Sequence, residues 1–334
     1  MNILKKYLVI QTASIGDVIL STAIGEKLKN HDAECQIDYL IKKGNEGVFY
    51  GNMNINELYI WDKKQEKYKN LLRIIFQIRE VKYDAVINLQ RFFSSGIFTV
   101  FSGAKKKYGF RKNPLSLFFS KSFPHQFKEG WHEVDRNQQL ISKITDGQAA
   151  KPHLYPTKKE YAKMSPYKTH AFITITPASL WFTKQFPKEK WVEMIREVDT
   201  DIHIYLLGGK DESDLCNAII RESNRANMLN MAGQLSFVES AALMQDALMN
   251  YVNDSAAQHI ASAVNAPTTA IFCSTVPSFG FGPLSDDSVV IQIEENLTCR
   301  PCGIHGHRTC PEGHFKCAIN IDKQELLKRL DDAR

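Results

Sequence analysis

The stretch MNYVNDSAAQHIASAVNAPTTAIF, residues 249–272, decides the fold of this chain. Residues 249–253 and 268–272 are short apolar runs typical of buried strands, and residues 255–264 between them have the length of a helix. A strand, a helix and a second strand in this order form a right-handed β-α-β unit with parallel strands. Sheets built from such units bind ligands beyond the carboxyl ends of their strands, so the loops after the strands are where function is sought.

The same alternation extends in both directions along the chain. Further strands are expected at residues 7–12, 36–41, 84–89, 171–176 and 202–207, and helices at 18–30, 65–82, 131–144, 188–198, 211–223 and 236–245. The alternation stops at residues 145–170, which contain three prolines and five lysines. The sequence therefore predicts an α/β protein with two doubly wound, Rossmann-like domains that face a cleft, residues 1–150 and 171–334, joined by a linker at 151–170.

Composition excludes several classes of protein. The chain has 334 residues, 43% hydrophobic and 24% charged, which is ordinary globular composition and not that of a disordered or fibrous protein. A net charge of +5 is too small to indicate a nucleic-acid partner. The best candidate for a membrane span, residues 92–101, has about half the ~18 residues needed and holds two serines and a glycine. The apolar run at residues 7–10 is too short for a signal peptide. We expect a cytoplasmic protein.

The first loop, residues 13–17, presents a carboxylate just after the first strand. Gly16 lets the backbone turn tightly, and Asp17 follows it at the start of the next helix. Asp17 either caps that helix or takes a proton from a substrate hydroxyl. The loop lacks the G-x-G-x-x-G pattern, so the dinucleotide fingerprint is absent here.

Two loops of the second half carry groups that suit a phosphate and a ribose. In the loop at 176–187, Ser179, Thr183 and Lys184 offer two hydroxyls and an ammonium group, although a solvated lysine is the alternative. After the strand at 202–207, two glycines allow a ligand close to the backbone. The acids that follow them either open a helix or bind ribose hydroxyls. These four residues are Gly208, Gly209, Asp211 and Glu212.

The loop at 253–259 runs from a strand directly into a helix. The backbone N–H groups of Ser255, Ala256 and Ala257 would be free at the helix start, which makes an anion site, although the same residues also form a good capping sequence. His259 would lie about one turn into the helix and is either structural or functional. Together the four loops predict a nucleotide diphosphate on the second domain and a reactive group on the first.

Six short motifs occur in a characteristic order: SIGDV at 14–18, SGAKKKYGFR at 102–111, HEVDRN at 132–137, TKQFP at 183–187, LLGGKDE at 206–212 and NDSAAQHIA at 253–261. Over nearly the whole chain, they resemble glycosyltransferase family 9, the ADP-heptose:lipopolysaccharide heptosyltransferases. The resemblance implies a GT-B fold and an enzyme that transfers a heptose from ADP-heptose to the lipopolysaccharide inner core, an acceptor of the Kdo–lipid A type, with inversion and without a metal. Partners would be the ADP-sugar and this anionic lipid-linked acceptor at the cytoplasmic face of the inner membrane.

The resemblance also assigns roles to residues. Asp17 matches the general base, and Lys184 the phosphate-contacting lysine. The expected donor-binding residues share positions in or next to the four loops: Ser14, Gly16, Ser179, Thr183, Lys184, Gly208, Gly209, Asp211, Glu212, Leu235, Asp254, Ser255, Ala256, Ala257 and His259. Of these, residues 254–257 would hold the diphosphate, Asp211 or Glu212 the ribose, and Leu235 the adenine.

The chain departs from the family pattern at two places. Ala256 stands where many members have glycine, and residues 179–182 read SLWF where a Trp-Pro arrangement is commoner. These departures bear on the donor sugar more than on the type of reaction. Three alternatives stay open: another nucleotide sugar or acceptor, a nucleotide-dependent enzyme such as an oxidoreductase, and a non-catalytic nucleotide-binding protein.

A basic segment at 102–129 holds seven Lys and Arg against one acid. The cations expected to bind the acceptor are Lys105, Lys106, Lys107, Arg111 and Lys112. Four phenylalanines are interleaved with the basic residues of this segment: Phe118, Phe119, Phe123 and Phe127. Basic and aromatic residues together suit peripheral contact with an anionic membrane, and the alternative is a solvated loop with core phenylalanines.

Four cysteines lie close together near the end of the sequence. Cys299, Cys302, Cys310 and Cys317 have the spacing C-x2-C-x7-C-x6-C, which predicts either a structural zinc site of four thiolates or a set of reduced thiols. A disulfide is less expected in the cytoplasm. No cofactor is expected to be required for catalysis.

Overall fold

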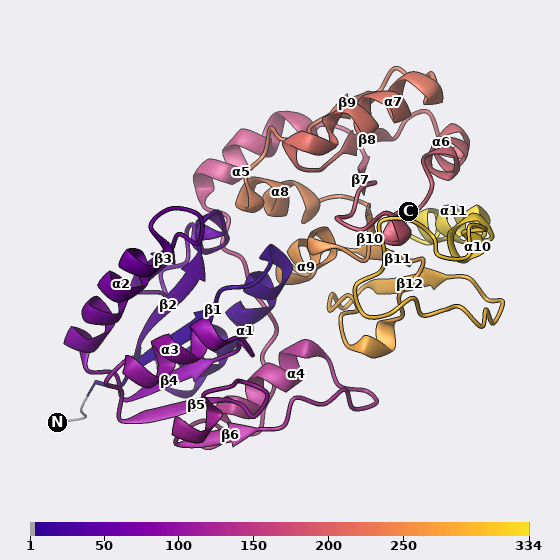
Figure 1. Cartoon of the computed structure of the whole chain (residues 1–334). Helices are drawn as coiled ribbons and strands as arrows, with labels where there is room; N and C mark the ends of the chain where they lie inside the picture. Colours follow the sequence, from indigo (N-terminus) through magenta and orange to yellow (C-terminus); the bar gives the residue numbers. More distant parts are fainter. Residues whose placement is uncertain (1–3, 334) are drawn as a thin grey trace. The chain divides into compact units, whose positions relative to one another are not determined.

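The computed structural model describes residues 4–333 and divides into two compact units, Met1–Tyr155 and Pro156–Arg334. Each unit is one six-stranded parallel sheet with helices packed against it (Figure 1). This confirms the predicted α/β class. The helix α5 (Lys158–Met164) and a 3-10 turn at Ser165–Lys168 occupy much of the segment expected as a linker.

The sheet of the first unit has the strand order β3-β2-β1-β4-β5-β6. Its strands are β1 (Lys6–Gln11), β2 (Gln36–Lys42), β3 (Glu57–Trp61), β4 (Ala85–Asn88), β5 (Lys106–Phe110) and β6 (Lys121–Phe123). In β1, Tyr7 is level with Ile37 on one side and with Ala85 on the other. The chain reverses its direction of winding between β1 and β4, and in doubly wound sheets the ligand site lies beyond the carboxyl ends at this switch point.

The helices of the first unit are α1 (Ile15–His31), α2 (Lys67–Val81), α3 (Phe93–Phe101) and α4 (Glu133–Gln138). Helix α2 buries Leu71, Ile74, Ile75 and Ile78, the i, i+3, i+4, i+7 spacing that places apolar side chains on one face. These side chains join Trp61 and the α3 residue Phe98 in one core cluster, so α2 and α3 cover the same face of the sheet.

The second unit repeats the topology. Its sheet order is β12-β11-β10-β7-β8-β9, with strands β7 (Phe172–Thr176), β8 (His203–Leu206), β9 (Met228–Asn230), β10 (Met249–Asn253), β11 (Thr268–Phe272) and β12 (Ser288–Gln292). Its further helices are α6 (Lys188–Glu197), α7 (Ser213–Ser223), α8 (Phe237–Met244), α9 (Ala256–Ala263), α10 (Lys316–Ile319) and α11 (Lys323–Asp331). The switch point here lies between β7 and β10, the strand that opens the stretch 249–272.

Several elements were not expected from the sequence: β3, β5, β6, β9 and β12, and helices α3, α5, α10 and α11. The helix expected at 131–144 is shorter, because α4 ends at Gln138 and a 3-10 turn follows at Gln139–Ile141. Within residues 4–333, no helix has both the length and the apolar character needed to cross a bilayer.

Candidate active site

Both switch points place polar groups at the carboxyl ends of adjacent strands. In the first unit, β1 leads to Asp17 and β4 leads to Arg91. In the second unit, β7 leads to Lys184 and β10 leads to Asp254. Because each pair of strands is parallel and adjacent, the topology brings the members of each pair to one edge of the sheet.

Asp17 caps helix α1 and keeps one oxygen available. The backbone N–H of Ser14 donates to Asp17 Oδ2 at 3.2 Å, and the Ser14 hydroxyl donates to the same oxygen. No described residue hydrogen-bonds the other oxygen, Oδ1, and the side chain is half-buried. The two interpretations of Asp17 are therefore compatible, since capping occupies only one of its oxygens.

Three hydrogen bonds hold the backbone of the loop that precedes Asp17. Lys63 donates to the carbonyl oxygen of Thr12 at 2.7 Å, and Asn45 donates to that of Ala13 at 3.2 Å. The backbone N–H of Ala13 in turn donates to the side-chain oxygen of Gln11 at 3.3 Å. These contacts fix the loop backbone, which orients the carboxylate at its end.

Positive charge surrounds this edge of the first unit. Burial raises the pKa of Glu133 at the start of α4, and Arg136, whose Nε lies 2.7 Å from Glu133 Oε2, opposes that rise. Asp17 raises the pKa of Glu133 further and Arg91 lowers it, so both charges lie within electrostatic reach of Glu133. Burial, followed by Arg91, Arg136 and Lys112, lowers the pKa of His125 to about 4. A neutral His125 therefore sits among cations at neutral pH.

The structure separates the five cations expected to bind the acceptor. Residues 105–107 lie at the start of β5, level with the start of β1, and the ammonium group of Lys105 is 2.8 Å from Asp84 Oδ1. Because the strands are parallel, these lysines lie at the amino ends of the strands, opposite the loop of Asp17. Arg111 and Lys112 follow β5 at the carboxyl ends, where that loop also lies. The acceptor role expected for Lys105, Lys106 and Lys107 stays a prediction, and these lysines lie at the other end of the strands from Arg111 and Lys112.

The interleaved phenylalanines also divide. Phe119 and Phe123 are buried in the first unit, as the core interpretation predicts. Phe118 and Phe127 are exposed. The segment 102–129 is therefore not one continuous basic and aromatic face.

In the second unit, Lys184 and Asp254 form a largely buried ion pair. Lys184 Nζ lies 2.6 Å from Asp254 Oδ2, and the two side chains are 14% and 8% exposed. The Thr275 hydroxyl donates to the same oxygen at 2.6 Å. Asp254 directly precedes Ser255, the N-cap of α9, so the ammonium group is held near the positive end of that helix.

Asn253, at the end of β10, fastens the lysine-bearing loop to the sheet. Its side-chain oxygen accepts from the backbone N–H of Phe186 at 2.9 Å, and its amide group donates to the carbonyl oxygen of Pro177 at 2.8 Å. Within the loop, the Gln185 amide donates to the carbonyl of Ser179 at 2.6 Å. Asn253 is fully buried, and no local sequence pattern indicated this positioning role.

The cysteine-rich segment packs against the same loop. The backbone N–H of His307 donates to Thr183 Oγ1 at 2.8 Å, and the N–H of Thr183 donates to the carbonyl of His307 at 3.1 Å. Gly306 has φ +74°, and a Cβ at this position would lie 2.8 Å from Thr183 Oγ1 and 3.2 Å from Ser274 Oγ. Glycine is thus required both by its backbone angle and by the close approach.

Arg300 holds the loop after β11, which carries Thr275. Its Nε donates to the carbonyl of Cys273 at 2.7 Å, and its Nη2 donates to that of Thr275 at 2.7 Å and to the side chain of Gln292 at 2.7 Å. The sequence around Arg300 has no pattern that would have predicted these contacts with the loop after β11.

The loop after β8 distinguishes the two acids considered for ribose. Glu212 Oε2 accepts from the backbone N–H of Gly209 at 2.7 Å, and it lies so close to Gly208 that a Cβ there would be 2.6 Å away. Asp211 is exposed, and its carboxylate has no hydrogen-bond or ion-pair partner among the described residues. Glu212 uses Oε2 for capping and no described residue hydrogen-bonds its Oε1, so both acids keep a carboxylate oxygen for a ligand. Leu235 is half-buried in the loop after β9.

Two buried hydroxyl oxygens at the switch point lack a partner within residues 4–333: Thr176 Oγ1 at the end of β7 and Ser255 Oγ at the start of α9. Ala256 and Ala257 are half-buried beside Ser255, whereas His259 is 5% exposed and belongs to the interior of the unit. Buried polar atoms without partners are uncommon, and an oxygen-rich ligand at this edge would satisfy them.

The four clustered cysteines do not form the zinc site that their spacing suggested. Cys302 Sγ donates to the carbonyl of Cys299 at 3.1 Å, and Cys299 Sγ lies 3.8 Å from His314 Nε2. Burial and the neighbouring thiols raise the pKa of Cys317 to about 11. Among the described residues, no three His, Cys, Asp or Glu side chains are arranged to hold a metal ion. The expected site at Cys299, Cys302, Cys310 and Cys317 is corrected to a set of free thiols in the structure.

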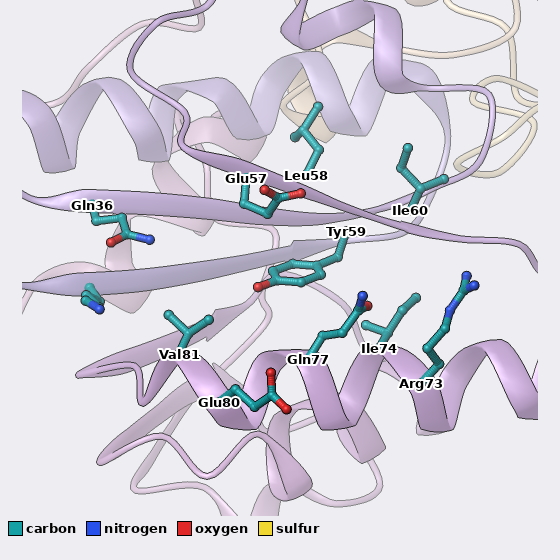
Figure 2. A pocket seen from close by; sticks show the side chains of 11 residues that line it. Gln36, Glu57, Leu58, Tyr59, Ile60, Arg73, Ile74, Gln77, Glu80 and Val81 are labelled. Carbon is teal, nitrogen blue, oxygen red and sulfur yellow. The ribbon is translucent and has the colours of Figure 1, made fainter.

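A pocket of about 740 Å³ lies elsewhere, beside the edge strand β3 (Figure 2). Gln36 and Glu57 from the strands face Gln77 and Glu80 of α2 across it, with Tyr59 between them. Gln36 and Glu57 begin their strands, so this pocket extends toward the amino ends. None of the expected site residues lines it.

Two Rossmann-like units with the same strand order, each with polar loops at its switch point, are the architecture of the GT-B fold. Residues 71–315 match the model of glycosyltransferase family 9 (heptosyltransferase), and the chain belongs to this family. It is therefore a glycosyltransferase.

Named relatives agree with this assignment. Lipopolysaccharide heptosyltransferase 3 of Escherichia coli is 27% identical over 78% of this chain and 81% of its own length. Lipopolysaccharide heptosyltransferase 1 of Campylobacter coli is 25% identical over 97% of both chains. The solved structure of E. coli ADP-heptose lps heptosyltransferase II has a TM-score of 0.80 at 19% identity, covering 98% of both chains, and supports the fold.

Proposed function

We propose that this enzyme transfers a heptose from ADP-heptose to the lipopolysaccharide inner core, with inversion and without a catalytic metal. The observation that carries the proposal is the ion pair of Lys184 and Asp254 beside the start of α9, where two buried hydroxyls lack partners. Heptose as the transferred sugar and lipopolysaccharide as the acceptor are proposed because the family and its relatives are named as lipopolysaccharide heptosyltransferases. The name of the E. coli structure supplies the ADP-heptose donor.

In the proposed reaction, the oxygen of an acceptor hydroxyl bonds to the anomeric carbon, and its proton passes to Asp17. The bond from that carbon to the diphosphate oxygen breaks, and ADP leaves with the electron pair. Lys184 and the backbone N–H groups of residues 255–257 stabilise the charge that develops on the diphosphate. In this proposal the ammonium group and the helix start take the stabilising role that a bound metal ion has in metal-dependent enzymes.

The acceptor is proposed to bind at the first unit's switch point. Arg91, Arg111 and Lys112 are exposed at that edge and suit the carboxylates of a Kdo-type sugar. Asp211 or Glu212 is proposed for the ribose and Leu235 for the adenine. The lipid-linked acceptor places the enzyme at the cytoplasmic face of the inner membrane.

Thermal unfolding with a panel of nucleotides tests the donor assignment. ADP at about 100 times its dissociation constant should stabilise the protein by roughly 2.7 kcal/mol, whereas UDP, GDP, CMP and NAD should not. Stabilisation by UDP or GDP would keep a glycosyltransferase and discard ADP-heptose. Stabilisation by NAD alone would favour the oxidoreductase alternative.

A transfer assay with ADP-heptose and a deacylated inner-core acceptor tests the reaction itself. We expect a product with inverted anomeric configuration by NMR, at a rate that EDTA leaves unchanged. Retention of configuration, or activity lost with EDTA and restored by a divalent cation, would refute the mechanism.

A further inference from the structure

One face of the first unit exposes an unusual run of large apolar side chains. On α2, Tyr68, Leu72 and Phe76 are 74%, 55% and 66% exposed. Their i, i+4, i+8 spacing makes them one stripe, beside the face that packs on the sheet. The stripe is separate from the side chains that α2 buries against the sheet, Leu71, Ile74, Ile75 and Ile78.

The adjoining helix α3 continues this apolar surface. Phe93 and Phe101, at its two ends, are 56% and 52% exposed. The stripe faces α3, because Arg79, one turn after Phe76 on the same flank of α2, donates to the carbonyl of Phe101 at 3.3 Å. Helices α2 and α3 run side by side over the sheet (Figure 1).

A third segment extends the surface beyond α3. Leu117 and Phe118 lie in a 3-10 turn and are 92% and 64% exposed. The turn is anchored to the start of α3, because the buried Asn113 donates to the carbonyl of Phe92 at 3.0 Å. We call α2, α3 and this turn, with their exposed apolar side chains, the apolar face. Monomeric soluble proteins rarely expose a contiguous surface of this kind without a partner.

The positive charge of the segment that carries the apolar face favours an anionic partner. Residues 63–112, the sequence segment that carries α2 and α3, contain thirteen Lys and Arg and three acids, a net charge of +10 for the segment where the whole chain carries +5. Two of the three acids, Glu66 and Asp84, already pair with Lys69 and Lys105. Exposed aromatic and aliphatic side chains within a positive field are the pattern of a surface that enters the interface of an anionic bilayer.

We propose that the apolar face of α2, α3 and the turn at 116–118 docks on an anionic lipid surface. The inference rests on the proposed function in one respect, since a lipid-linked acceptor gives a membrane contact its purpose. Phe93 begins α3 directly after the loop of Arg91, so a bilayer at this face would present a lipid-linked sugar next to the proposed acceptor cations.

Co-sedimentation with vesicles tests the docking. The full chain should bind phosphatidylcholine vesicles that contain about one third phosphatidylglycerol, bind phosphatidylcholine alone at least tenfold more weakly, and dissociate as salt is raised. The double variant Leu72→Glu/Phe76→Glu should bind at least tenfold more weakly than wild type. Met53→Glu is the matched control, because Met53 is 96% exposed in the same unit but outside the apolar face.

Two further measurements separate this inference from the proposed function. Stabilisation by ADP and transfer to the deacylated acceptor need no bilayer, so the double variant should retain both, which also shows that it folds. Binding that is equal for wild type and double variant, or independent of anionic lipid, would overturn the docking. So would a dimer that the double variant dissociates in the absence of any lipid binding, since the face would then join two copies of the chain.

Discussion

Replacing Lys184 with methionine removes the ammonium group but keeps most of the side chain's length, and so tests the donor site directly. Removing one preorganised donor from a developing negative charge costs about 3 kcal/mol, or roughly two orders of magnitude in kcat/KM. We expect this loss in the ADP-heptose assay, together with loss of the stabilisation by ADP.

The same change should destabilise the second unit, for a reason that the ion pair supplies. Removing Lys184 leaves the Asp254 carboxylate, 8% exposed, without its cation. Breaking a fully buried pair costs about 3–5 kcal/mol. Thr275 still donates to Asp254 and the pair keeps some contact with water, so we expect about 2 kcal/mol. For a unit the size of residues 156–334, this lowers the unfolding midpoint by roughly 4–8 °C.

The double variant Lys184→Met/Asp254→Asn distinguishes the two effects. It removes both charges, so the unfolding midpoint should return toward that of wild type while the loss of ADP binding and of transfer persists. A Lys184→Met variant that unfolds at the wild-type temperature, is stabilised by ADP as before and retains transfer within threefold would refute the role assigned to this lysine.

Three other predictions follow from the site. Asp17→Asn should lower transfer by about 10²–10⁴-fold with little loss of stability, because the side-chain oxygen of asparagine can still accept from the Ser14 N–H at the start of α1. Gly306→Ala should destabilise the second unit by about 1–3 kcal/mol and weaken ADP binding, because φ is +74° and the new Cβ would meet Thr183. Gly303 has a similar φ but no atom within 4 Å of a new Cβ, so Gly303→Ala should cost only the strain of a positive φ. Burial lowers the pKa of His125 to about 4, so the unfolded chain binds a proton more readily than the folded chain. The free energy of unfolding should therefore be highest above about pH 6.5 and fall as the pH drops toward 4. His125→Phe should flatten that fall.

Each of these has a result that contradicts it. Asp17→Asn with near wild-type turnover would remove the general base. Equal effects of the two glycine substitutions, measured by urea unfolding and by ADP titration, would show that the close approach to Thr183 is unimportant. An acid unfolding profile that is identical in His125→Phe would assign the pH dependence to other groups.

The fold was predictable because its information is local. Alternation of apolar runs with helical periods marks parallel strands, and the pair 249–253 and 268–272 was placed to the residue. The short edge strands β6 and β9 were missed, since three residues carry too little periodicity. Lys184 and Asp254 were both singled out, yet their ion pair depends on contacts between β7 and β10 that no spacing records.

Other parts of the site lie beyond local patterns for the same reason. Lys105–Lys107 appeared next to Arg111 in the sequence, but a strand of five residues separates them by its length and carries them to opposite edges of the sheet. Arg300, Gly306 and His307 act through main-chain contacts with residues far away in the chain. The cysteine spacing suggested coordination, but it specifies neither the direction of the thiols nor their distance.

The hydrogen bonds between Thr183 and His307 also determine when, during synthesis, the loop of Lys184 can be completed. The two residues are separated by 124 positions, so the lysine-bearing loop of a nascent chain lacks this partner until the cysteine-rich segment has left the ribosome. The first unit is translated well before that point and has its own core. A growing chain therefore presents Asp17 and the apolar face before the loop of Lys184 has its hydrogen-bond partner at His307.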